Sequence, residues 1–277
     1  MSFVHRLADL SEALFYRTSK RVVDEIRSVG HLFIFIYDGI RLLFAPPSRF
    51  GELVKHMEFV ANQSLGIITL TALFTGLALS LQVYLGFKMV NATNLVGPIV
   101  ALAITRELGP VLTGLIVAAR AGGAMAARLG TMRVNEQIDA IDVMGIDPKQ
   151  YLISPRLAAA VISMPLLTAV FDFVAMIGSY FLVVHLVHLD EAIFWQKIRD
   201  TIEIRHIMEG LIKSAFFGLI FSGICTYRGF FTKGGAKGVG EATNRGVVVS
   251  MVMIIVLDYF LTSMIRFYYL MTGNTSL

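Results

Sequence analysis

Charged residues are scarce in this sequence. Only 16% of its 277 residues are charged, 56% are apolar, and the mean hydropathy is +0.69. A soluble domain carries about a quarter charged residues. The single cysteine, Cys225, excludes an intramolecular disulfide. Because the apolar residues fall in long runs, lipid is the expected solvent for most of the chain.

Sequence motifs for catalysis and nucleotide binding are also missing. No GxxxxGK[ST] phosphate loop, HExxH, GxSxG or paired Cys/His metal spacing occurs. The glycine-rich stretch Lys233–Gly240 is therefore interpreted as a mobile loop. No basic soluble domain that could bind nucleic acid is present. We expect no enzyme activity, no catalytic residue, no metal and no cofactor, so any ATP must be hydrolysed by another subunit.

Five apolar runs reach the length of about 20 residues that a membrane-spanning helix needs. They are Leu65–Phe87, Leu95–Ala119 with a helical continuation to about Gly130, Leu157–His188, Ile207–Tyr227 and Gly246–Leu270. The predicted fold class is an all-α integral membrane protein, with a five-helix transmembrane domain over residues 65–277.

Residues 1–64 have a different pattern, typical of helices that lie in the membrane interface. Apolar side chains recur at helical spacing in three stretches: Phe3, Leu7, Leu10 and Leu14; His31–Phe44, which Pro46 and Pro47 stop; and Phe50, Leu53, Val54 and Met57. An amphipathic helix on a protein partner would give a similar pattern. We favour the interfacial interpretation because basic residues directly precede a span.

Basic residues outside the spans predict the orientation. Residues 1–64, 120–156 and 228–245 hold 17 Lys and Arg, against 5 on the other side. Since Lys and Arg accumulate on the cytoplasmic side, we expect a cytoplasmic N-terminus and a C-terminus outside.

Charged residues within spans are costly, so they are expected to face the bundle interior or a wet cavity. The clearest are Arg106, Glu107, Asp172, Lys213 and Asp258. Arg106 and Lys213 could meet a phosphate-bearing headgroup. Equally, the charges could pair internally, for example Arg106 with Asp258 or Lys213 with Glu107.

Two other classes of protein stay open from these residues. An ion-coupled secondary transporter could use Glu107, Asp172 and Asp258 as a proton relay, although five spans without an inverted repeat argue against it. A membrane scaffold without a substrate ranks last, because intramembrane charges are costly without a purpose.

The second span contains a proline and two rows of small residues. Pro110 removes a helical hydrogen bond and is expected to bend the helix. Small residues recur at intervals of four in two rows: Ala118, Gly122, Ala126 and Gly130, and Ala119, Gly123 and Ala127. Such rows allow close packing of helices, within one chain or across a dimer.

Between the second and third spans, Met132–Gly145 predicts a short exposed helix at about 133–144. Asn135 or a neighbour is expected to cap its start, and Gly145 to end it. The acidic residues Glu136, Asp139 and Asp142 would be repelled by anionic lipid. The pattern therefore favours docking into a groove of a soluble partner over a helix lying on the bilayer.

Several motifs together resemble the MlaE permease family, over about residues 50–272. They are Arg106-Glu107-Leu108-Gly109-Pro110-Val111, Arg120-Ala121-Gly122, Glu136–Met144, Asp147-Pro148, Ile153-Ser154-Pro155-Arg156, Leu211-Ile212-Lys213-Ser214 and Gly238–Arg245 leading to Asp258. These permeases are the inner-membrane subunits of bacterial ABC transporters that move phospholipids between the inner and outer membranes.

The resemblance implies partners and site residues. It implies a homodimer, an ABC ATPase subunit, a periplasmic MCE-domain hexamer and, in some systems, a STAS-domain protein. It implies a phospholipid cavity at the dimer interface, bordered here by Leu77, Leu81, Tyr84, Arg106, Glu107 and Lys213. The helix at about 133–144 would be the coupling helix to the ATPase, with Glu136, Asp139, Asp142 and Met144 as contact residues. The N-terminus would be cytoplasmic and the C-terminus periplasmic.

Overall fold

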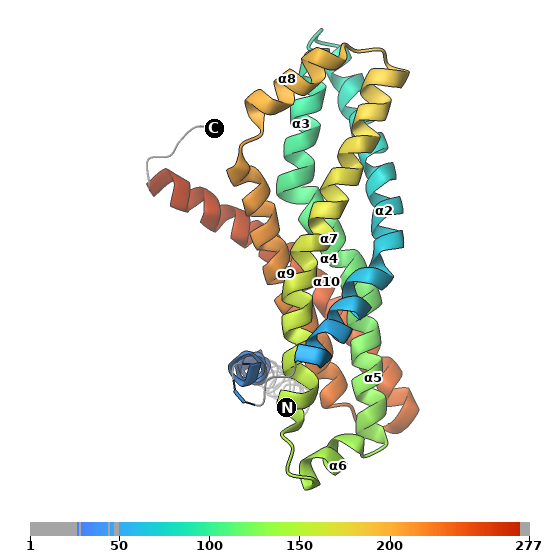
Figure 1. Ribbon diagram of the computed structural model, residues 1–277, viewed down its shortest axis with the longest axis vertical. Coiled ribbons are helices and arrows are strands. Elements are labelled where there is room, and N and C mark those ends of the chain that lie inside the picture. The colour runs from blue at the N-terminus through green and yellow to red at the C-terminus, as the bar shows by residue number, and fades with distance from the viewer. Residues whose placement is uncertain (1–26, 28, 44, 47–49, 272–277) are drawn as a thin grey trace, which may run out of the picture.

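The computed structural model describes residues 27, 29–43, 45–46 and 50–271, and this part of the chain forms helices and no strand (Figure 1). The predicted stripe Phe3, Leu7, Leu10 and Leu14 lies outside the described residues. Five helical runs are long and apolar enough to cross a membrane: Phe50–Lys88, Thr93–Val134, Lys149–Leu186, Ile204–Phe230 and Gly235–Met271. The prediction of an all-α membrane protein with five spans is confirmed.

Three of these runs are single helices: α2 (Phe50–Lys88), α9 (Ile204–Phe230) and α10 (Gly235–Met271). The second run joins η1 (Thr93–Leu95), α3 (Val96–Ala103), η2 (Ile104–Leu108), α4 (Gly109–Val117), η3 (Ala118–Gly122) and α5 (Gly123–Val134). The third joins η4 (Lys149–Ile153), α7 (Ser154–Tyr180) and η5 (Phe181–Leu186). The expected boundary between residues 64 and 65 lies inside α2, which starts at Phe50.

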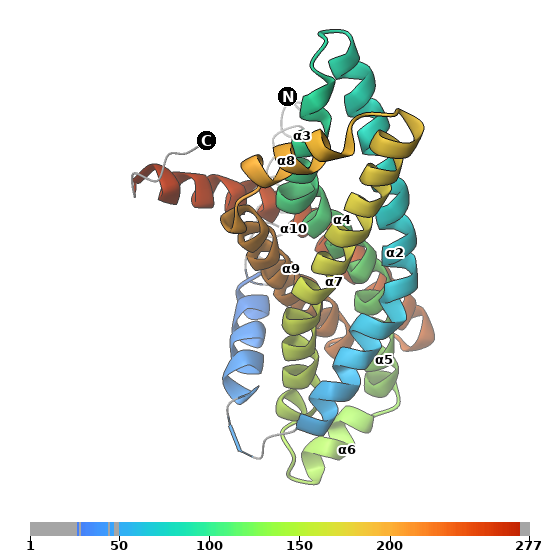
Figure 2. The same cartoon turned by 45° about the horizontal axis from the view of Figure 1, so that its top comes forward.

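Two short helices mark the ends of the bundle. The helix α6 (Gln137–Val143) and the helix α8 (Glu191–Thr201) lie at opposite ends (Figures 1 and 2). The sequence pattern did not predict α8. The sequence nevertheless contains an N-cap residue for this helix: the Asp190 carboxylate accepts a hydrogen bond from the Ile193 N–H at 3.1 Å.

The predicted helix at about 133–144 is shorter than expected. The helix α5 continues through Val134, and Asn135 ends α5 rather than capping α6. Glu136 then turns the chain with a left-handed φ of 58°, without a side-chain cap hydrogen bond. Gly145 ends α6 with φ +76°, as predicted.

The predicted loop at Lys233–Gly240 is wrong from Gly235 onward, where α10 begins. Gly234 and Gly235 have φ values of +91° and +66°, which allow the tight turn between α9 and α10. A Cβ at Gly238 would overlap the Lys233 carbonyl oxygen. The glycines therefore serve a close chain reversal.

Small residues bring α2 against α7 along much of their length. A Cβ at Gly76 would overlap the carbonyl oxygen of Ala175, and one at Gly178 would lie 2.6 Å from the carbonyl oxygen of Leu73. Further along, the Ser80 hydroxyl donates to the Ser179 hydroxyl at 2.7 Å. In lipid the hydrophobic effect does not drive helices together, so the van der Waals contacts of this close approach hold α2 against α7.

The row Ala118, Gly122, Ala126 and Gly130 is fully buried inside the chain. A Cβ at Gly122 would lie 2.9 Å from the Cys225 Sγ atom, and one at Gly229 of α9 would lie 2.6 Å from the Ala126 carbonyl oxygen. In the second row, Gly123 faces Val247 of α10. The predicted close packing of helices is confirmed, and these contacts are made within one chain.

Residues 29–43 form a helix beside the α6 end of the bundle (Figure 2). Phe35 packs against Tyr227 and Phe230 of α9 in edge-on and tilted ring contacts. Gly223 leaves room for Ile36, since a Cβ there would lie 2.5 Å from the Ile36 side chain. An interfacial position for this helix stays a prediction.

We predict that Gly76→Ala lowers the free energy of unfolding by about 2 kcal/mol, because the added methyl group forces α2 and α7 apart. Gly66→Ala on the same helix is the matched control, since a Cβ at Gly66 meets nothing within 4 Å. Thermal unfolding of both purified variants in detergent measures the difference. Equal midpoints for the two variants would contradict the packing described here.

Candidate functional site

The second span is irregular where its charged residues lie. It contains two π-helical turns, η2 and η3, and these hold Arg106 and Arg120. At η2, the Gly109 N–H donates to the Ile104 carbonyl oxygen, five residues earlier. Pro110 has no N–H to donate to the Arg106 carbonyl oxygen, four residues before it. The Arg106 carbonyl oxygen is therefore available to another donor.

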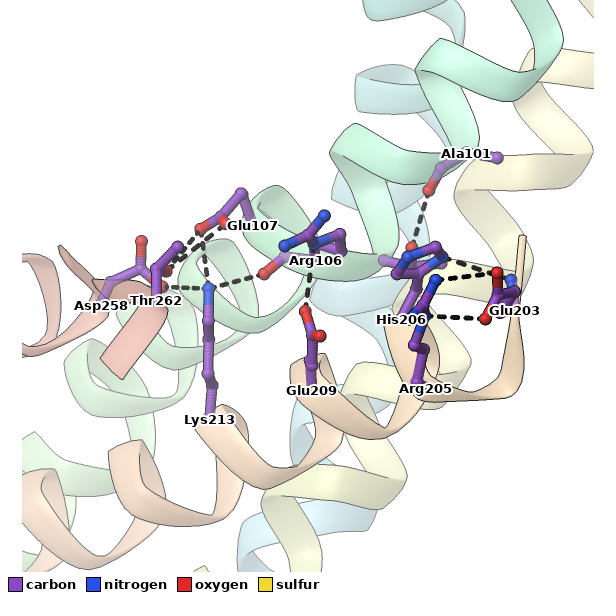
Figure 3. Close-up of polar contacts among 11 residues, drawn as sticks. Ala101, Arg106, Glu107, Glu203, Arg205, His206, Glu209, Lys213, Asp258 and Thr262 are labelled. Atoms are coloured by element: carbon purple, nitrogen blue, oxygen red, sulfur yellow. Dashed lines mark hydrogen bonds and ion pairs between the residues drawn. The ribbon is translucent and has the colours of Figure 1, made fainter. Parts of the chain in front are cut away.

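Lys213 of α9 supplies that donor (Figure 3). Its Nζ atom donates to the Arg106 carbonyl oxygen at 2.8 Å, to Glu107 Oε2 at 2.8 Å and to Asp258 Oδ1 at 3.1 Å. An ammonium group has three N–H donors, so all of them are used. One side chain thus joins the second, fourth and fifth spans.

Exposure differs sharply among the members of this cluster. The Lys213 side chain is only 2% exposed, whereas that of Glu107 is 41% exposed. Thr262 of α10 donates weakly to both Glu107 carboxylate oxygens, at 3.4 Å each. A buried ammonium without its partners would cost several kcal/mol. Lys213 is therefore the buried member that holds the cluster together, and Glu107 is the member that other molecules can reach.

Arg106 makes a second ion pair next to the first. Its Nε atom lies 3.1 Å from Glu209 Oε2 of α9, and the Glu209 side chain is 7% exposed while that of Arg106 is 36% exposed. The close approach of α9 to η2 depends on Gly210, because a Cβ at this position would overlap the carbonyl oxygen of Thr105 in η2. Arg106 thus neutralises a buried carboxylate and still presents part of its guanidinium at the surface.

The structure contains one of the two internal pairings that the sequence left open. The pairing of Lys213 with Glu107 is confirmed. The pairing of Arg106 with Asp258 is wrong, because Arg106 pairs with Glu209. Sequence reasoning overlooked Glu209 and Thr262. A signal for Glu209 was present, since Glu209 and Lys213 are four residues apart and share a helix face, opposite the adjacent Arg106 and Glu107.

Asp172 lies apart from this cluster. Its Oδ1 atom is buried against Gly109 and has no hydrogen-bond partner among the described residues. Glu107 and Asp258 instead meet at Lys213. Within the described part of the chain, Asp172 Oδ1 is therefore not joined by hydrogen bonds to the other two carboxylates considered for a proton relay.

The other expected lipid-contacting residues lie on α2. Leu81 is exposed, and Leu77 and Tyr84 are half-buried against the core. The Lys88 ammonium lies 5.7 Å from the centre of the Tyr84 ring. The hydrogen bonds and ion pairs of the Arg106–Lys213 cluster involve only the second, fourth and fifth spans among the described residues. The expected contact residues on α2 therefore take no part in these polar contacts.

The α6 end carries a second candidate surface. Ile138 anchors α6 in a buried cluster with Leu129 and Ile153, and Arg133 Nη1 lies 2.5 Å from Asp139 Oδ1. Beyond these anchors, the apolar side chains of Val143 and Met144 are 89% and 67% exposed. The helix is thus held firmly while its apolar tip stays uncovered.

A crevice of about 1070 Å³ lies beside α6. The helix at residues 29–43 forms its other wall, and Lys149 Nζ bridges to Asp38 Oδ2 at 2.7 Å. Asp139 and Asp142 line it, whereas Glu136 is exposed at the start of α6.

The chain was compared with known proteins. The family model described as Permease MlaE matches residues 53–264. A probable ABC transporter permease protein of Rickettsia conorii is 37% identical over 245 residues, which cover 88% of this chain and 95% of that protein.

Two further relatives carry more specific names. The intermembrane phospholipid transport system permease protein MlaE of Haemophilus influenzae is 35% identical over 247 residues, with 88% of this chain and 94% of that protein covered. The chloroplastic protein TRIGALACTOSYLDIACYLGLYCEROL 1 of Arabidopsis thaliana is 39% identical over 217 residues, or 76% of this chain and 60% of that protein.

We predict that Lys213→Met lowers the free energy of unfolding by about 3 kcal/mol, because it leaves two carboxylates without their buried cation. Adding Glu107→Gln and Asp258→Asn should restore much of this loss, since the carboxylate charges are then removed as well. The exposed Lys237→Met is the control. Unfolding midpoints that are equal for Lys213→Met and the control would refute the anchoring role.

Proposed function

The chain belongs to the MlaE permease family, and from this membership we propose that it is the membrane subunit of an ABC transporter that moves phospholipids between the inner and outer membranes. The observation that carries the proposal is the family match over residues 53–264, which includes the charged cluster and α6. Relatives named as ABC transporter permeases and as a phospholipid transport permease support it.

The energy for transport comes from a partner ATPase in this proposal. The chain has no phosphate-loop motif. The surface that fits such a partner is α6, which combines a fixed base with an uncovered tip at Val143 and Met144. A short apolar helix end of this kind suits a groove on a soluble protein. Glu136, Asp139, Asp142 and Met144 are the proposed coupling contacts.

The lipid binds between two copies of the chain. The helix α10 supports this arrangement, because Gly246, Ser250 and Ile254 are its buried residues and large apolar side chains such as Tyr259 and Met264 are exposed. Its C-terminal half extends away from the bundle (Figure 1). A second copy would cover this face and bring the α2 surface with Leu77, Leu81 and Tyr84 close to Arg106 and Glu107.

Within that cavity, Arg106 and Glu107 are the proposed headgroup contacts. Both side chains are more than a third exposed and they carry opposite charges. An arginine suits a phosphate oxygen through its planar fork of donors. Lys213 is a positioning residue, because its three donors already hold Glu107, Asp258 and the Arg106 carbonyl oxygen.

Further partners follow from the family resemblance. We place the α6 end and the N-terminus in the cytoplasm and the C-terminus in the periplasm of an inner membrane. A periplasmic MCE-domain hexamer would receive or deliver lipid at the α8 end, and a STAS-domain protein would bind the ATPase in some systems. The position of α6 and α8 at opposite ends fits this division of partners (Figure 2).

The mechanism couples the two surfaces. ATP binding draws the two ATPase subunits together and moves the two α6 helices with them. The dimer interface tightens, the cavity narrows, and the acyl chains lose their site. The π-helical turn η2 is suited to this step, because such turns interrupt the regular hydrogen bonding of a helix at functional sites.

We predict that Val143→Glu together with Met144→Glu weakens association with the ATPase subunit at least about tenfold, because two carboxylates must then enter an apolar groove. Co-purification from cells that express all subunits measures this effect. The control is Met89→Glu with Val90→Glu, two adjacent exposed apolar residues that follow α2 at the end of the bundle opposite α6. Undiminished ATPase recovery with the α6 variant would rule out this docking surface.

A second prediction concerns the headgroup. Arg106→Gln with Glu209→Gln removes the guanidinium without leaving a buried carboxylate unpaired. We expect the double variant to fold but to retain about tenfold less phospholipid, since a charged hydrogen bond to the headgroup is lost. Mass spectrometry of lipid bound to the purified dimer measures retention, and Glu209→Gln alone is the control. If both proteins retain equal amounts of phospholipid, Arg106 does not bind the headgroup.

A further inference from the structure

Two guanidinium groups lie against one aromatic ring near the start of α2. The Arg120 Cζ atom is 4.9 Å and the Arg128 Cζ atom 4.4 Å from the centre of the Phe59 ring. A third guanidinium, that of Arg156 in the first turn of α7, lies close enough to Arg128 for their charges to repel. Segments η3, α5 and α7 thus gather three positive charges around α2.

The hydrogen bonds that Arg120 and Arg156 form within the described residues go to neutral groups. Arg120 Nη1 donates to the Phe59 carbonyl oxygen at 2.8 Å and to Ser64 Oγ at 3.0 Å, while Nη2 donates to Gln63 Oε1. Arg156 donates to the Leu152 carbonyl oxygen. These acceptors carry no charge, so they orient the guanidinium groups without neutralising them.

No nearby carboxylate among the described residues balances the cluster. Arg128 contacts the Phe59 ring and forms no ion pair with the part of the chain that the structure describes. The Glu52 carboxylate lies near enough to Arg156 to offset part of its charge, but it is shared with Lys55 Nζ, which lies 2.8 Å from it. Converging guanidinium groups repel one another unless an anion lies between or beside them.

Two of the three arginines are accessible, and the cluster lies at the α6 end. Arg128 is exposed, Arg120 is partly exposed and Arg156 is 7% exposed. Figure 2 shows the start of α2 beside α5 and α7 at the end of the bundle that carries α6. The exposed apolar side chains Ile67, Leu70 and Phe74 of α2 follow at helical spacing from Gln63, which accepts a hydrogen bond from Arg120. A molecule with an anionic headgroup and an apolar chain would match this surface.

We propose that Arg120 and Arg128 bind the phosphate of an anionic phospholipid in the leaflet on the α6 side, and that the buried Arg156 adds to the positive charge of the site. Guanidinium groups bind phosphate oxygens through paired donors, and the lipid acyl chain lies along the apolar face of α2. This site differs from the Arg106–Lys213 cluster, where carboxylates already balance the cations. The bound lipid holds the start of α2 against α5 and α7.

The test uses the full chain in nanodiscs of phosphatidylcholine, with and without a minor fraction of phosphatidylglycerol. Native mass spectrometry measures the retained phosphatidylglycerol, and thermal unfolding measures its stabilising effect. Arg128→Glu supplies a carboxylate within the cluster, so its preference for phosphatidylglycerol should fall about tenfold. Its midpoint in phosphatidylcholine alone should equal or exceed that of the wild-type chain, which shows that it still folds.

Two further variants sharpen the result. Arg128→Gln removes the charge without reversing it and should also lose the preference, whereas Arg41→Gln, another exposed arginine on the α6 side, should keep it. A retained preference in Arg128→Glu would overturn the proposal. The last measurement is the thermal unfolding of the chain in phosphatidylcholine nanodiscs with added inorganic phosphate. If phosphate alone stabilises the chain as much as phosphatidylglycerol does, the site binds a free ion and the lipid assignment fails.

Discussion

The structure depends on one buried ammonium group. Lys213 lies almost out of contact with solvent, and its three donors reach a backbone carbonyl oxygen and two carboxylates on separate spans. Pro110 makes the arrangement possible, since it leaves the Arg106 carbonyl oxygen without its usual helical donor. An unpaired charge would be costly inside a membrane, but here the paired Lys213 ammonium links α9 to η2 and α10. The same hydrogen bonds fix the positions of Glu107 and of the Arg106 backbone, and the side chains of both residues are partly exposed. Lys213 therefore contributes to the stability of the bundle and to the position of the candidate site.

The two ends of the bundle differ in kind. The α6 end has an anchored helix with an uncovered apolar tip and, beside it, guanidinium groups that lack carboxylate partners in the described residues. The other end carries the amphipathic helix α8, which packs Phe194 against Gly97. Between them, α10 exposes most of its apolar surface. The proposed function depends on surfaces of each of these kinds.

The sequence predicted the five spans because long apolar runs have few alternatives to a spanning helix. It also offered the ion pair between Lys213 and Glu107 as one of its open alternatives, and the structure contains that pair. It did not predict Glu209 as the partner of Arg106, because the register between two spans depends on contacts such as the approach of Gly210 to Thr105. The start of the short helix near Asn135 was predicted, but the left-handed φ of Glu136 was not, since an exposed glutamate rarely adopts it. Hydropathy also placed the starts of α2 and α10 too late, where polar residues continue a helix beyond its apolar part.

The most direct test of the account is ATP-driven lipid transfer by the assembled complex. Proteoliposomes that contain the chain with its ATPase subunit would be loaded with a fluorescent phospholipid, and its transfer to a soluble MCE-domain acceptor would be followed with and without ATP. We predict a change in the rate or the extent of transfer that requires ATP hydrolysis and both subunits. Transfer that is the same without ATP, or without this chain, would contradict the account.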